Sequence, residues 1–115
     1  MENWYLDQEQ IETFFIDWIE LIHAARTESE QHERLREIFN MIEDCLDYKR
    51  FDALDGLLEY VDQEQTSTFL ITGILRGTFR ARKILKNWSP FRDRAIDTIQ
   101  KRGEDPKILV GLLDK

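Results

Sequence analysis

Helix breakers, covalent crosslinks and long apolar runs are all scarce in this sequence. Its 115 residues include two prolines, five glycines and one cysteine. Because Cys45 cannot form an internal disulfide, a reducing, cytoplasmic compartment is the simplest interpretation. The longest apolar runs, such as residues 69–71, are too short to cross a membrane. The N-terminus lacks a basic region followed by an apolar block, so we expect neither a membrane span nor a secretory signal.

Acidic and basic residues are separated along the chain. Residues 1–66 hold 18 acidic residues against five basic ones, whereas residues 67–115 hold five acidic against 11 basic. The overall net charge of −7 therefore combines a strongly acidic half with a basic half. Such asymmetry directs association more than it determines fold. Apolar residues make up 42% of the chain, which is enough for a core and excludes a wholly disordered protein.

Apolar residues recur at the 3.6-residue period of an amphipathic helix along most of the chain. Start signals precede several segments, for example Thr27 followed by Glu30 and Ser89 followed by Pro90. No stretch alternates polar and apolar residues as a half-buried strand would, so the sequence predicts an all-α protein. The expected helices cover residues 7–26, 28–48, 50–61, 67–87, 90–102 and a short last one near 106–113.

The predicted connections are short, which favours five to six antiparallel helices in one domain over residues 1–115, with 1–6 as a short N-terminal arm. Two architectures fit. One is an irregular helical bundle. The other is a short HEAT-like repeat stack, because helix pairs recur about every 40 residues, with Phe51 and Phe91 each opening a pair. Gly73 and Gly77 are spaced to allow close approach of a neighbouring backbone to the fourth helix.

Metal and cofactor sites are not expected. Glu20 and His23 have the Glu-x-x-His spacing of di-iron bundles, but such a site needs two of these motifs facing inward. The other histidine, His32, has Ser29 three residues before it, and Glu20 and His23 lie opposite the apolar face. A solvated polar face is the better interpretation, with no metal bound.

A catalytic cysteine is not expected either. Cys45 has Glu43, Asp44 and Asp47 as neighbours, and these carboxylates should raise the pKa of the thiol and suppress its thiolate. A small buried side chain is the better interpretation. The chain also lacks a glycine-rich phosphate loop following a strand. We therefore predict a protein that is not an enzyme.

The basic half contains the strongest candidate for a binding surface. Arg76, Arg80 and Lys83 follow the spacing i, i+4, i+7, and Arg92 and Arg94 lie in the next helix. Such a cluster could bind nucleic-acid phosphates. Against this, the net charge of −7 would repel nucleic acid at long range.

An acidic stripe on the third helix offers a different role for these basic residues. Asp52, Asp55, Glu59 and Asp62 lie at three- and four-residue spacing. The charge split falls in the connection between the third and fourth helices, so opposite charges would meet inside one hairpin. Neutralisation, within the chain or across a protein partner, is therefore favoured over nucleic-acid binding.

The sequence as a whole predicts a non-catalytic protein–protein interaction module, either an adaptor or a self-associating homo-oligomer, that uses charge-complementary helical faces. Two alternatives stay open: nucleic-acid binding through the basic stripe, and an acidic inhibitor or immunity-type protein that binds a basic target. The aromatic residues before the first helix are further candidate anchors. The candidate partner-binding residues are Trp4, Tyr5, Asp52, Asp55, Glu59, Arg76, Arg80, Lys83, Arg92 and Arg94.

Overall fold

Seven helical elements make up the part of the chain described by the computed structural model, residues 7–105 and 107. These residues contain no β-strand, which confirms the predicted all-α class. The predicted last helix, near 106–113, lies outside the described residues. The elements are α1 (Gln8–His23), α2 (Glu28–Asp47), α3 (Phe51–Tyr60), the 3₁₀ helix η1 (Gln63–Gln65), α4 (Thr68–Thr78), the 3₁₀ helix η2 (Phe79–Ala81) and α5 (Trp88–Lys101).

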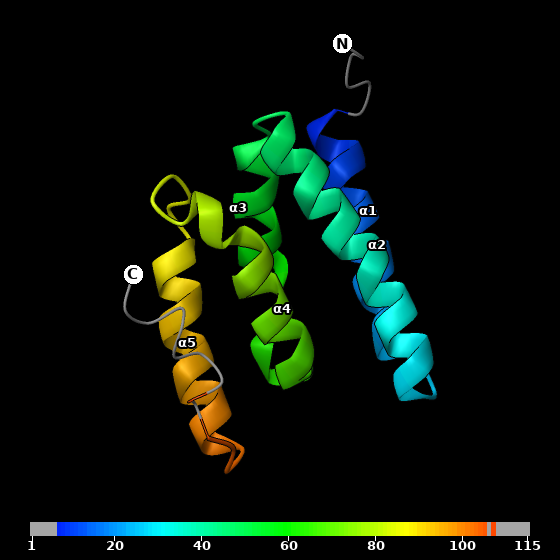
Figure 1. Ribbon diagram of the computed structural model, residues 1–115, viewed down its shortest axis with the longest axis vertical. Helices are drawn as coiled ribbons and strands as arrows, with labels where there is room; N and C mark the ends of the chain where they lie inside the picture. The colour runs from blue at the N-terminus through cyan, green and yellow to red at the C-terminus, as the bar shows by residue number, and fades with distance from the viewer. Residues whose placement is uncertain (1–6, 106, 108–115) are drawn as a thin grey trace.

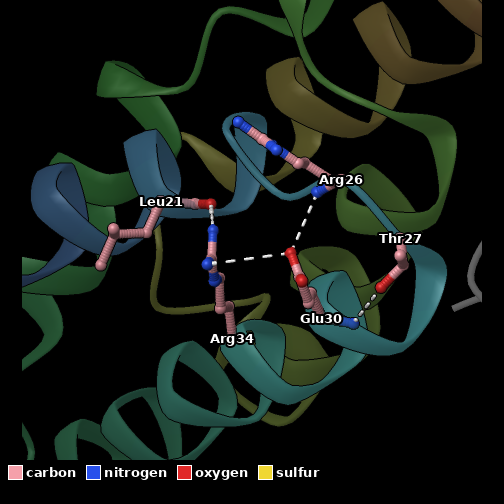
Figure 2. A network of polar contacts seen from close by, with 5 residues as sticks. All are labelled: Leu21, Arg26, Thr27, Glu30 and Arg34. Carbon is pink, nitrogen blue, oxygen red and sulfur yellow. Dashed lines mark hydrogen bonds and ion pairs between the residues drawn. The ribbon is translucent and has the colours of Figure 1, made fainter.

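The turn between α1 and α2 is held by the capping residues that the sequence indicates (Figure 2). The Thr27 hydroxyl accepts a hydrogen bond from the Glu30 amide at 3.1 Å, as an N-cap residue does. The Glu30 carboxylate accepts from the amide of Arg26 and lies 3.9 Å from the Arg34 guanidinium. Arg34 in turn donates to the Leu21 carbonyl near the end of α1. The turn therefore fixes α1 antiparallel to α2.

The five α-helices form an irregular bundle (Figure 1). α1 and α2 lie side by side at one edge, α5 lies at the other, and α3 and α4 lie between them. Two contacts show that α2 and α4 run parallel to each other. The ring of His32 stacks on Phe69 near the start of both helices, and Glu43 further along α2 pairs with Arg80, which follows α4. Helices adjacent in space here are therefore not always adjacent in sequence.

The third and fourth helices do not form the packed hairpin that the sequence predicts. α3 packs mainly against α1, α2 and α5, whereas α4 packs mainly against α2 and α5. The acidic stripe of α3 consequently does not face the basic stripe of α4. The contacts of α1 with α3, of α2 with α4 and of α3 with α5 are those that stacked helix pairs make, whereas α3 and α4 make few contacts with each other. The described residues therefore form a helical bundle with irregular packing.

The fourth helix is shorter than predicted. The sequence indicates one helix over 67–87, but α4 ends at Thr78 and the chain continues through η2 and turns. Leu85 and Trp88 are both buried, whereas Ile84 is 59% exposed. A turn after η2 returns these two large side chains to the core, and their burial outweighs the cost of ending a helix early.

The start of α5 also differs from the prediction. The helix begins at Trp88 rather than with Ser89 as its N-cap, and Pro90 lies in its first turn. Asn87 precedes the helix and is tied to α3, since its amide donates to the Asp55 carboxylate at 3.0 Å and its side chain donates to the Asp55 carbonyl. Proline is tolerated there because a first-turn amide has no intrahelical partner.

One apolar core joins all five α-helices. Each helix contributes several buried residues at the spacing expected from its amphipathic pattern. None of the described helices combines the length and apolar character needed to cross a membrane. The largest fully buried side chains include Phe15 of α1, Leu35 and Ile42 of α2, Leu57 of α3, Leu70 of α4, and Trp88 and Phe91 of α5.

Candidate protein-interaction surface

An apolar groove runs along the outer surface between α2 and α4. It has a volume of about 730 Å³. The groove lies between two parallel helices and is lined by residues of both, so it is open to apolar side chains of another molecule. We call it the α2–α4 groove, and its lining residues are Phe39, Glu43, Thr68, Phe69, Thr72, Gly73, Arg76, Gly77 and Glu104.

Gly73 and Gly77 of α4 form part of the groove. The sequence predicts that the backbone of a neighbouring helix approaches them, but in the structure side chains of α2 lie closest to them. A Cβ atom on Gly73 would lie 2.9 Å from Cε1 of Phe39 and closer still to Cζ. At Gly77 the nearest atoms would be methyl carbons of Ile42 at 3.6 Å, an ordinary contact distance. The ring of Phe39 therefore occupies the space left by Gly73 and brings α2 and α4 together.

Phe69 stands at one end of the groove as an exposed aromatic residue. Its side chain is 47% exposed, and its ring stacks on that of His32 with centroids 4.5 Å apart and planes 4° apart. Sequence reasoning missed this residue as a binding candidate. The signal was present, because Phe69 and Gly73 lie on the same helical line as Arg76 and Arg80, at i, i+4, i+7 and i+11.

A second, smaller depression of about 210 Å³ continues the same face beyond the groove. It is lined in part by Leu46, Phe51 and the exposed Ile84. Arg80 also lines it, and the guanidinium of Arg80 lies 2.7 Å from the carboxylate of Glu43, which lines the first groove. The ion pair thus joins the two depressions into one surface, which we call the α2–α4 face.

The two sides of the α2–α4 face carry opposite charges. On the α2 side lie the exposed carboxylates of Glu43 and Asp47, which we call the acidic row. On the α4 and η2 side lie the exposed guanidinium groups of Arg76 and Arg80, the basic row. The face therefore combines apolar depressions with an acidic edge and a basic edge.

Several predicted basic residues have structural roles. Arg92 is only 22% exposed, pairs with Asp93 at 3.1 Å and lies 5.6 Å from the ring of Trp88. Lys83 is exposed, but it follows η2 and so does not share one helix face with Arg76, as the predicted stripe requires. The basic stripe of the sequence is therefore not a continuous surface.

Asp55 and Glu59 of the acidic stripe lie on the side of α3 that faces α5. Asp52 is exposed and Asp55 accepts the hydrogen bond from Asn87. Glu59 and Arg94 both line a groove of about 650 Å³. Carboxylates and cations therefore line one groove between α3 and α5, whereas the prediction placed the two signs of charge between the third and fourth helices. The other charged residues of that groove are Asp62, Glu64, Lys86, Asp97 and Lys101.

The one cysteine of the chain, Cys45, lies buried in the core on α2. Burial raises the pKa of Cys45 to about 12, with a smaller raising contribution from Asp44 and an opposing one from Arg50. The sequence correctly predicts that the pKa of the Cys45 thiol is raised, but burial rather than the neighbouring carboxylates is the main cause. Within residues 7–105 and 107, no group of three His, Cys, Asp or Glu side chains is placed to hold a metal ion. Trp4 and Tyr5 lie outside the described residues.

Comparison with family models, curated proteins and solved structures found no match for this chain.

Proposed function

We propose that this protein is a non-catalytic interaction module that binds another protein through the α2–α4 face. The observation that carries the proposal is the continuity of this face, in which two apolar depressions adjoin with Phe69 and Ile84 exposed at 47% and 59%. Exposed apolar surface of this kind, bordered by charged residues, is typical of protein interfaces. The partner we propose presents exposed apolar side chains with basic residues along one edge and acidic residues along the other.

Nucleic-acid binding has weaker support. Such binding needs several exposed cations on one surface. Arg80 and Arg92 are already paired with Glu43 and Asp93, and Arg94 shares its groove with carboxylates. The acidic-inhibitor hypothesis depends on the charge of the first three helices alone. We therefore keep protein binding as the proposed function. The free thiol of Cys45 suggests a cytoplasmic setting, which is part of the proposal.

Site-specific photo-crosslinking tests the proposal. A benzophenone amino acid replaces Phe69 on the α2–α4 face and, in a matched control, replaces Leu21 of α1, which is 42% exposed. Irradiation in the producing cells should give discrete crosslinked products from position 69 and none of the same products from position 21. Equal crosslinking from both positions, or none from position 69, would contradict the proposed site.

A further inference from the structure

We infer that the partner on the α2–α4 face is a second copy of this chain, arranged around a two-fold axis that runs along the groove. This inference rests on the proposed function and names its partner. The argument depends on the two charged rows, on the parallel direction of α2 and α4, and on the apolar residues between them.

The charged rows make the face complementary to itself. A two-fold axis along the groove places α2 of one copy over α4 of the other, and the reverse contact forms at the same time. The acidic row of each copy then lies opposite the basic row of the second copy. Two faces of uniform charge would repel each other, whereas the α2–α4 faces of two copies attract each other.

The parallel direction of α2 and α4 preserves the register of the contacts. Rotation about an axis parallel to both helices does not shift residues along that axis. Since Glu43 lies beside Arg80 within one chain, it also lies level with Arg80 of the second copy. The same level is kept at the other end, where His32 stacks on Phe69 within the chain. The internal pairs and the pairs across the interface can therefore form together.

The apolar part of the face would be covered by the same arrangement. Phe69 and Ile84 are exposed at opposite ends of the face, and both would be buried against the second copy. α4 and η2 together span residues 68–81, which gives a length of roughly 20 Å, and two packed helices give a width of roughly 20 Å. Such a contact buries about 400 Å² on each copy and about 800 Å² in total, which is less than a standard specific interface, so we expect a weak, reversible dimer.

Charge reversal across the interface tests the dimer. E43R and R80E each place like charges opposite one another, and each change acts twice because of the two-fold axis. Sedimentation velocity from low to high micromolar concentration should show the wild-type dimer and an association weakened about tenfold or more in either single variant. Circular dichroism checks that both variants remain folded.

Mixing the two variants separates the interface from the internal ion pair. In an equimolar mixture, the arginine introduced by E43R lies opposite the glutamate introduced by R80E on the other chain. The unchanged Arg80 of the first variant likewise lies opposite the unchanged Glu43 of the second. We expect the mixture to form a heterodimer and the double variant E43R/R80E to form a homodimer. If only the double variant recovers, or if wild-type protein is monomeric at every concentration, the inference is wrong.

The crosslinking experiment distinguishes failure of this inference from failure of the proposed function. A product of twice the chain mass from position 69, containing only this chain, supports the second copy as partner. A product that contains a different protein overturns the inference and leaves the proposed function in place. Absence of any product from position 69 contradicts both.

Discussion

Alanine substitution at two glycines of α4 should change stability in opposite directions. In a helix interior, alanine is favoured over glycine by about 1 kcal/mol because glycine has more backbone freedom to lose. At Gly77 the added methyl group would meet Ile42 at 3.6 Å, an ordinary contact. We therefore expect Gly77→Ala to raise the free energy of unfolding by about 0.5–1 kcal/mol.

At Gly73 the same substitution meets the ring of Phe39. The new Cβ would lie 2.9 Å from Cε1 and closer to Cζ, so the ring or the whole of α2 must move. Overpacking of this kind costs about 1–3 kcal/mol and outweighs the gain in helix propensity. We expect Gly73→Ala to lower the free energy of unfolding by about 1 kcal/mol and the melting temperature by about 4 °C.

Urea denaturation followed by circular dichroism measures both variants. Phe39→Leu provides the control, because removal of the ring opens the space beside residue 73. In that background Gly73→Ala should become neutral or stabilising. Measurements at two protein concentrations separate folding stability from self-association, since both glycines lie on the proposed interface. Equal stabilisation by Gly73→Ala and Gly77→Ala in both backgrounds would refute the reasoning.

Two further outcomes follow from buried polar groups. Thr78→Val removes the hydroxyl that accepts the indole N–H of Trp88 at 3.0 Å, so the free energy of unfolding should fall by about 1–3 kcal/mol in urea denaturation, while Thr78→Ser should retain most of it. For Cys45, the folded thiol has a pKa of about 12 against an ordinary value of 9.0, so the unfolded chain releases its proton first and stability should fall as the pH rises above about 9. Cys45→Ala should reduce this slope, and an unchanged slope would show that other groups cause it.

The local signals in the sequence predict much of the fold correctly. Thr27 caps α2 through the amide of Glu30, as its capping motif indicates, and Asp7 caps α1 in the same way through the amide of Gln10. The Glu30 carboxylate departs from the ideal motif, because it binds the amide of Arg26 instead of the N-cap amide. Such contacts join residues within four positions of each other, so local sequence is sufficient to predict them.

The candidate site was predicted less well because it depends on contacts between distant residues. Arg80 appears in the sequence as part of a basic stripe, but its partner Glu43 lies on α2, 37 residues earlier. Phe69 appears as one more apolar residue of an apolar helix, and only the position of α2 leaves it exposed beside His32. Helical periodicity identifies which residues share a line, but it does not identify the helix that faces them.

The sequence by itself determined the all-α class, the first three helices and the separation of charge, because each of these follows from residue type and local spacing. The tertiary structure alone decided which charges meet. Burial of Leu85 and Trp88 ends α4 early, and the ring of Phe39 beside Gly73 brings α2 against α4. The acidic row of α2 thereby lies beside the basic row of α4 and η2, with apolar depressions between them. Packing of the core selects this arrangement, since charge pairs at the surface are too weak to determine the order of helices.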